Sequence, residues 1–257
     1  MTGLGAKRDH VFYPALSIAI SATGFAGFSF TYFGPMFGGT YPPAGAALHV
    51  HGWSFFLWYL LFPLQAVLIG RRKRALHMAL GRASVALVVL MTSTGLLVLS
   101  VRVAEALRES APGIWLLYGP LILSNLVLFV AFYVASLRMA MTNRMQEHKR
   151  LIVVASAIGL GAGFFRLVLV LSGHHPLSLP IGVLACSAFI LAGAAYDWFS
   201  RGSVHPVYWI GLAAMFAVEV PLLPQVSEGT VAWVNGWLAA LGDRIGFLYV
   251  PEPTVEF

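Results

Sequence analysis

The chain has little charge for its length. Asp, Glu, Lys and Arg make up 10% of its 257 residues, whereas hydrophobic residues make up 59%. Because a soluble domain carries about 25% charged residues, this chain cannot give a water-facing surface to a core of its own. The composition therefore argues against a soluble globular protein and predicts an all-α, polytopic integral membrane helical bundle.

Cysteine and the usual catalytic motifs are also scarce. The single Cys186 lies inside an apolar stretch, which excludes a disulfide, a C-x-x-C pair and a thiolate metal site. The sequence has no G-x-S-x-G, no phosphate loop, no H-E-x-x-H and no C-x-x-C-H. The glycine-rich segment 159–163 falls in the middle of an apolar stretch, where it favours close helix packing. No catalytic residue is predicted.

What the chain does have is seven apolar stretches long enough to cross a bilayer. A membrane-spanning helix needs about 20 predominantly apolar residues. Residues 1–225 are therefore predicted to form a seven-span transmembrane domain. Its spans are expected at about 12–33, 48–69, 77–100, 115–137, 149–171, 178–198 and 206–223.

Residues 226–257 differ from these stretches in being more polar and interrupted by glycine. They contain Trp233, Trp237, Phe247 and Tyr249 among scattered charges. Aromatic residues mixed with charge are typical of a helix that lies in the membrane interface. We expect an interfacial helix and tail on the outer side, with an eighth span as the alternative.

The net charge of +6 comes from cations grouped in the loops on one side of a seven-span arrangement. Such grouping marks the cytoplasmic side of a membrane protein, whereas nucleic-acid binding would need a folded polar domain. We therefore expect a multi-pass protein of the bacterial inner membrane, with a cytoplasmic N-terminus, an outer C-terminus and no nucleic-acid partner. The cations concerned are Lys7, Arg8, Arg71, Arg72, Lys73, Arg74, Arg138, Arg144, Lys149, Arg150 and Arg201.

Three of these basic loops end on a histidine that opens the next apolar stretch, namely His77, His148 and His205. Helix-end histidines are usually caps or interfacial groups. Two histidines from adjacent spans at one depth are better evidence for a ligand, because they can bind heme iron from both faces while arginines pair with its propionates. His77 and His148 are predicted to bind a cofactor, together with Arg82 and Arg166.

A second layer of polar residues is expected near the outer face. Arg166 follows His148 by 18 residues, which is roughly 27 Å along a helix, and Glu219 reaches a similar depth. Because a charge at that depth costs at least ~2.5 kcal/mol, we expect these two to share a polar network or to bind something polar. Snorkelling to the headgroups is the alternative. A metal site is predicted from His49, His51, His174, His175 and Glu219.

These residues resemble those of a family of uncharacterised bacterial membrane proteins with a domain of unknown function. The shared pattern is a glutamine, an arginine-rich loop and His-x-x-x-Gly-Arg, followed by a second histidine with an arginine 18 positions on. The matching residues are Gln65, Arg71–Arg74, His77, Gly81, Arg82, His148 and Arg166. Met78 and Lys149 depart from the pattern. The resemblance covers about residues 45–170, and it implies the architecture without implying an activity.

Three function classes follow from the sequence. The first is a membrane protein that binds a transition metal ion or heme in a redox or metal-dependent role. The second is a non-catalytic subunit of a larger membrane complex, in which lipids, other subunits or a second copy of the chain are the partners. The third is a transporter.

Overall fold

The computed structural model describes residues 3–41, 44–110, 113–223 and 225–249, and in these ranges all regular structure is helical. Four helices have 25 residues or more, namely α1 (Gly3–Phe28), α3 (Ala46–Gly70), α4 (Arg74–Arg108) and α5 (Ile114–Met141). The other elements are the π-helical η1 (Ser29–Phe33), α2 (Gly34–Phe37), α6 (Met145–Ile158), α7 (Gly161–Leu171), α8 (Ser178–Ala185), α9 (Ser187–Arg201), α10 (Pro206–Glu219), η2 (Val220–Leu222), α11 (Glu228–Ile245) and η3 (Gly246–Leu248).

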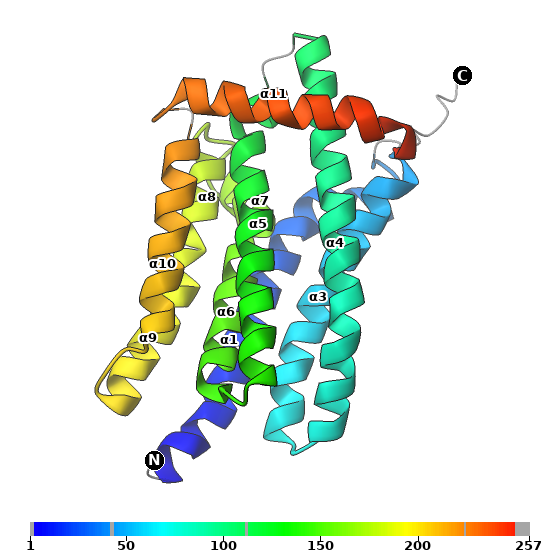
Figure 1. Ribbon diagram of the computed structural model, residues 1–257. Coiled ribbons are helices and arrows are strands. Elements are labelled where there is room, and N and C mark those ends of the chain that lie inside the picture. Colours follow the sequence, from blue (N-terminus) through cyan, green and yellow to red (C-terminus); the bar gives the residue numbers. More distant parts are fainter. Residues whose placement is uncertain (1–2, 42–43, 111–112, 224, 250–257) are drawn as a thin grey trace.

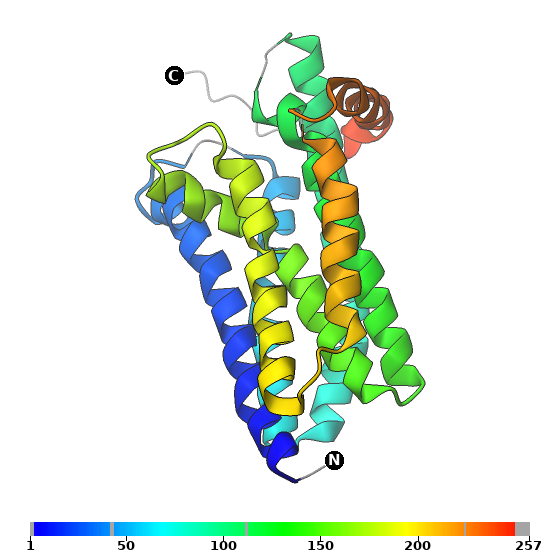
Figure 2. The same cartoon turned by 90° about the vertical axis from the view of Figure 1, so that its left-hand side faces the viewer.

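The helices form one elongated bundle (Figure 1). Turns 71–73, 142–144 and 202–205 lie at the same end as the N-terminus, and we call this the basic end. Helix α11 lies across the opposite end, which we call the α11 end, and Figure 2 shows it nearly end-on. The prediction that the basic loops share one side of the molecule is therefore confirmed.

Five helical segments are long and apolar enough to cross a membrane: Asp9–Phe37, Ala46–Gly70, Arg74–Arg108, Ile114–Met141 and Ser178–Arg201. A sixth is present if α6 and α7, which meet at a bend of 46°, count as one broken span. The predicted seventh span at 206–223 is an apolar helix of only 17 residues, Pro206–Leu222. At 1.5 Å per residue it is about 26 Å long, which is short of a bilayer core of about 30 Å. The seven-span count is therefore not supported, although a multi-pass membrane protein is.

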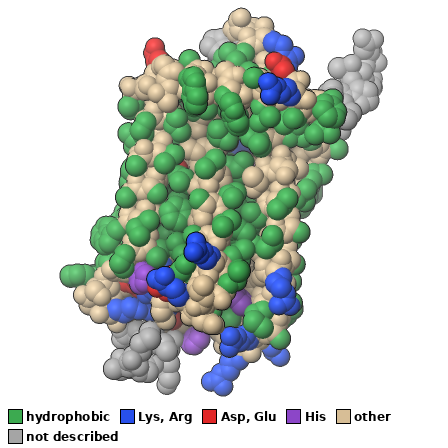
Figure 3. Space-filling model, viewed as in Figure 1, with side chains coloured by type: hydrophobic (Ala, Val, Ile, Leu, Met, Phe, Trp, Pro, Cys, Tyr) green, Lys and Arg blue, Asp and Glu red, His purple; other side chains and the backbone are tan. Residues whose placement is uncertain are grey.

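The surface of the bundle has the polarity that a bilayer requires. Apolar side chains cover its waist in Figure 3, while Lys and Arg gather toward the basic end, with a smaller group at the α11 end. Large hydrophobic residues such as Leu60 and Val89 are exposed on this waist. Helix α6 lies inside, where Ala155, Ala157 and Ile158 are buried against other helices. Apolar residues thus face both inward and outward, as expected when lipid replaces water as the solvent.

Helix α11 is amphipathic. Val231, Asn235 and Leu238 are buried against α4 and α5, while Trp233 and Trp237 are exposed one turn apart. The predicted helix after residue 225 is therefore present, and its exposed tryptophans are suited to a membrane interface. Residues 250–257 of the predicted tail lie outside the described residues.

At the basic end, five charged side chains form a network that ties α1, α6 and α9 together. The guanidinium of Arg150 donates two hydrogen bonds to the carboxylate of Asp197, at 2.7 and 2.8 Å. Arg201 bridges Asp197 and Asp9, and Lys149 donates to Asp9. Arg150 and Asp197 are both almost fully buried, and every charge in the network has an opposite partner. Buried charges satisfied in this way hold helices in register.

Candidate functional site

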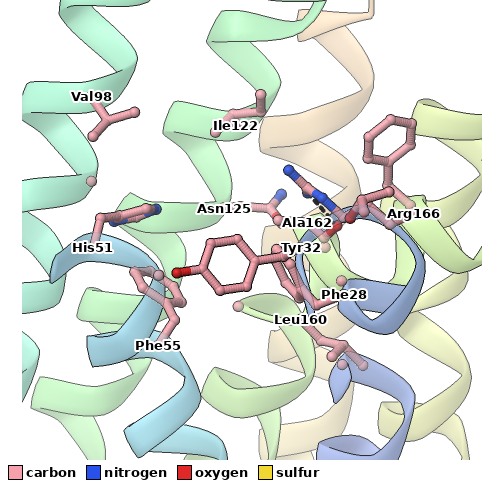
Figure 4. A pocket seen from close by; sticks show the side chains of 18 of the residues that line it. Phe28, Tyr32, His51, Phe55, Val98, Ile122, Asn125, Leu160, Ala162 and Arg166 are labelled. Carbon is pink, nitrogen blue, oxygen red and sulfur yellow. Dashed lines mark hydrogen bonds between the residues drawn. The ribbon is translucent and has the colours of Figure 1, made fainter. Parts of the chain in front are cut away.

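The candidate site is a partly open cavity of about 310 Å³ in the half of the bundle nearer α11. Figure 4 shows side chains that line it. Helices α1, α3, α4, α5 and α7 surround it. Its walls are mainly aromatic and aliphatic, and no Asp or Glu lines it within the described part of the chain. The aromatic lining includes Phe25, Phe28, Phe55, Trp115, Phe129 and Phe165. An apolar cavity with a few polar groups is the usual form of a small-molecule site.

The close approach of α1 and α7 forms one wall of this cavity. A Cβ atom at Gly27 would lie 1.9 Å from the carbonyl oxygen of Gly163, so only glycine fits there. Glycine is also required at the bend between α6 and α7, because a Cβ atom at Gly161 would lie 2.0 Å from Oδ1 of Asn125. These glycines explain why the segment 159–163 is rich in small residues, as its packing role predicted.

Arg166 is the cation of the cavity. It leaves α7, points inward, and lies with its Cζ atom 4.5 Å from the centre of the Phe28 ring and 5.8 Å from that of Phe165. Its Nη1 donates to the carbonyl oxygen of Ala162 at 2.8 Å, and within the described residues no carboxylate pairs with it. Arg166 is half-buried, and cation–π contacts offset only part of the cost of removing a guanidinium from water. Arg166 therefore retains several unused donors that face the cavity.

His51 lies at the opposite side of the cavity and comes from α3 (Figure 4). Its ring packs against Phe55, with centroids 4.7 Å apart, and against the backbone of Gly95. A Cβ atom at Gly95 would lie 3.1 Å from Cε1 of His51, so this glycine makes room for the ring. Nδ1 of His51 is buried and has no hydrogen-bond partner among the described residues. Nδ1 lies on the side of the ring that faces Gly95, so a ligand in the cavity would meet the other ring nitrogen, Nε2.

Glu219 does not pair with Arg166 directly. It is completely buried on α10, where its Oε1 accepts a hydrogen bond of 2.9 Å from Nδ2 of Asn125 on α5. Asn125 in turn lines the cavity together with Arg166. No hydrogen bond among the described residues links Asn125 to Arg166, so the predicted shared network is not formed, and an asparagine that the sequence analysis did not single out lies between Glu219 and the cavity. A lone Asn in the apolar run 114–141 is the signal that could have identified it.

The predicted metal ligands do not come together. His49 and His51 lie in a regular stretch of α3, so their rings point in different directions, and Nδ1 of His49 is 2.9 Å from the hydroxyl of Tyr32. His174 and His175 are exposed in the loop between α7 and α8. Across the residues that the structure describes, no group of three or more His, Cys, Asp or Glu could hold a metal ion. Because α3 is regular at His49 and His51, this H-x-H pair cannot chelate one ion.

The other predicted pair does meet. The rings of His77 on α4 and His148 on α6 have centroids 6.4 Å apart near the basic end. Nδ1 of His148 lies 3.0 Å from the carbonyl oxygen of Ser136, whereas Nδ1 of His77 is buried without a partner among the described residues. Arg82 is on the exposed side of α4, and Arg166 lies at the distant cavity. The four residues predicted to share one cofactor are thus divided among three places.

Comparisons of the chain with protein-family models, with curated proteins and with solved structures find no match. The resemblance to uncharacterised bacterial membrane proteins stays a prediction. What the cavity and the histidine pair do must be inferred from their own residues.

Proposed function

We propose that this chain is a membrane-embedded binding protein whose cavity holds an amphipathic small molecule. The polar end of that molecule lies against Arg166 and is anionic or accepts hydrogen bonds. The observation that carries this proposal is a guanidinium that faces an aromatic cavity without a carboxylate partner among the described residues. A charge at this depth is costly and marks a functional site when it faces the protein interior.

The shape of the surroundings supports the same conclusion. The α6–α7 bend lies beside the cavity, and broken helices at membrane depth are tolerated where they line an internal space. The cavity volume is near the lower limit of about 300–1,000 Å³ for small-molecule sites. A molecule with one ring system or one acyl chain suits this volume better than a diacyl phospholipid does.

The test is the binding of dodecanoate to the detergent-solubilised full chain, measured by native mass spectrometry. Arg166→Gln removes the charge, and we expect it to weaken binding at least tenfold, which corresponds to about 1.4 kcal/mol. Arg102→Gln is the matched control, because Arg102 pairs with Glu105 and does not line the cavity. Equal affinity in the wild type and in Arg166→Gln would overturn the proposal.

A second candidate function is the binding of a transition metal ion or heme iron by His77 and His148. A metal–imidazole bond is about 2.0–2.1 Å long, so two rings that share one ion have centroids roughly 6 Å apart. The observed separation is 6.4 Å, and the contact from His148 to a backbone carbonyl is the usual outer-shell partner of a ligating imidazole. This pair favours a redox or metal-dependent role over the predicted three-ligand site.

Metal analysis and an absorption spectrum of the purified protein test this candidate. We expect about one equivalent of metal or heme in the wild type, and its loss in His148→Ala. His205→Ala is the control, because His205 also lies at the basic end but caps α10. Less than about a tenth of an equivalent in the wild type would exclude the candidate.

We also propose that the basic end faces the cytoplasm of a bacterium and that the α11 end faces outward. The supporting observation is that turns 71–73, 142–144 and 202–205 lie at one end of the bundle. Lipids are then the immediate partners of the apolar waist.

A further inference from the structure

The cavity offers hydrogen-bonding groups on two opposite walls. Arg166 on α7 supplies unused N–H donors on one side, and the imidazole of His51 on α3 lines the other. The two side chains come from helices that are far apart in the sequence, and both line the same space. A ligand that satisfies both of them must carry a polar atom at each of two ends.

The space between these two groups suits a flat, unsaturated body. Four phenylalanines from four different helices line it, namely Phe28, Phe55, Phe129 and Phe165. Trp115 on α5 also lines it. Aromatic side chains contact a planar ring through stacked or edge-to-face arrangements, which add to simple burial. A saturated acyl chain would be stabilised only by the burial of its apolar surface.

The charges around the cavity exclude a cationic ligand. Within the described residues its lining includes Arg166 and no carboxylate, while Glu219 lies behind Asn125. The ligand is therefore neutral or anionic. A neutral molecule with an acceptor at each end of a planar ring meets every one of these conditions.

We propose that the cavity binds a para-quinone of the membrane, with one carbonyl oxygen at Arg166 and the other at His51. This inference rests on the proposed function and deepens it by naming the ligand class. The neutral imidazole donates from Nε2 to a carbonyl in one tautomer and accepts from a hydroxyl in the other, so the quinone and its quinol both fit. A fatty acid has acceptors at one end only and would use Arg166 without His51.

The experiment compares decyl-benzoquinone with dodecanoate as ligands of the full chain in lipid nanodiscs. Trp115 lines the cavity, so quenching of its fluorescence reports quinone binding, and Trp115→Phe identifies that part of the signal. Dodecanoate binding is measured by competition with the quinone and by native mass spectrometry.

Three variants accompany these measurements. His51→Leu removes the second polar contact, and His51→Gln restores a hydrogen-bonding side chain. His49→Gln is the matched control, since His49 contacts Tyr32 and does not line the cavity.

We expect His51→Leu to weaken quinone binding by about tenfold, the usual effect of one buried hydrogen bond. His51→Gln should recover most of that loss, and dodecanoate binding should be the same in all three proteins. Gly95→Ala gives a second route if His51→Leu misfolds, because its added methyl group displaces the imidazole while retaining it. Its expected effect is also a weaker affinity for the quinone alone.

The failures are distinguishable. Dodecanoate binding that depends on Arg166, combined with no quinone binding, overturns the quinone assignment and leaves the proposed function intact. Quinone binding that is unchanged in both His51→Leu and Gly95→Ala also overturns the assignment. If neither ligand binds in an Arg166-dependent way, the proposed function and this inference fall together.

Discussion

Arg150 and Arg166 lie on the two halves of one bent helical segment, α6 and α7, yet their surroundings are opposite. Arg150 forms a two-point ion pair with Asp197 inside a network in which every charge has a partner. Arg166 has one backbone carbonyl and two aromatic rings around it, with open space beyond. The comparison separates two uses of a cation within the bundle, one buried at Arg150 and one half-buried at Arg166. At the basic end, charges are satisfied within the protein and fix the packing, whereas in the cavity one charge is left for a ligand.

The largest expected effect comes from breaking the satisfied site. Arg150→Ala leaves the Asp197 carboxylate buried without its main partner, and loss of one member of a buried pair costs about 3–5 kcal/mol. We expect a strong fall in the thermal unfolding temperature, measured by size-exclusion chromatography after heating. Arg144→Ala is the control, because the Arg144–Glu147 pair is at the surface and should contribute less than about 1 kcal/mol. Similar losses in the two variants would contradict the contrast.

The second expected effect is a gain in stability instead of a loss. Arg166→Leu removes a charge that lacks a carboxylate partner in the described residues, so the ligand-free protein should gain about 2 kcal/mol of stability. The same change should abolish dodecanoate binding. Thermal unfolding with and without ligand measures both outcomes. A fall in stability like that of Arg150→Ala would show that Arg166 is structural too.

A third change sharpens the comparison by altering the cavity wall without touching a charge. Gly27→Ala forces a methyl group against the backbone of Gly163, which should cost about 1–3 kcal/mol and reduce ligand affinity. Gly236→Ala is the matched control on α11, because no atom lies within 4 Å of its added Cβ. That control should be neutral or slightly stabilising, since alanine is the better helix former. Equal behaviour of the two variants in unfolding and binding measurements would argue against tight α1–α7 packing.

The smallest effect concerns pH at the basic end. Nδ1 of His205 accepts a hydrogen bond from the backbone N–H of Val207 and so caps α10. Burial, together with the charge of Arg150, lowers the pKa of His205 below its usual value. The cap therefore contributes its full stability above about pH 6.5 and loses it as the pH falls through the lowered pKa.

Between pH 7 and pH 5 we expect the unfolding temperature of the wild type to fall about 1–2 °C more than that of His205→Asn. Asparagine caps a helix without titrating, so the difference between the two proteins isolates the histidine from the nearby carboxylates. Parallel pH profiles would show that the cap is not what titrates.

Apolar run lengths and helix-end signals predicted most of the fold. The helices at 46–70, 74–108 and 114–141 follow from stretches bounded by charged or Gly/Pro-containing loops, and the helix after residue 225 follows from its aromatic and polar mixture. The span count failed at α10, where an apolar run was counted although it is too short. The 46° bend was also not predicted, because glycines within an apolar helix indicate close packing or a break equally well.

The site was predicted only in part. Helical spacing from His148 put Arg166 in the half of the bundle away from the basic end, where it lies, and its insertion cost favoured an inward direction. Three features could not be predicted from the sequence, because they depend on how each helix is rotated about its axis relative to its neighbours. Asn125 separates Glu219 from the cavity, Arg150 meets Asp197 across 47 positions, and Arg82 faces outward rather than toward the histidine pair.

The enclosed position of Cys186 has a practical consequence for establishing which way the protein sits in its membrane. This is the single thiol of the chain, and it is fully buried between α8 and α9. A cysteine introduced at an exposed turn, such as Asn143 at one pole or Ser110 at the other, would be the sole group to react with an impermeant maleimide applied to intact cells. The native sequence thus already provides a silent background for side-specific chemical labelling.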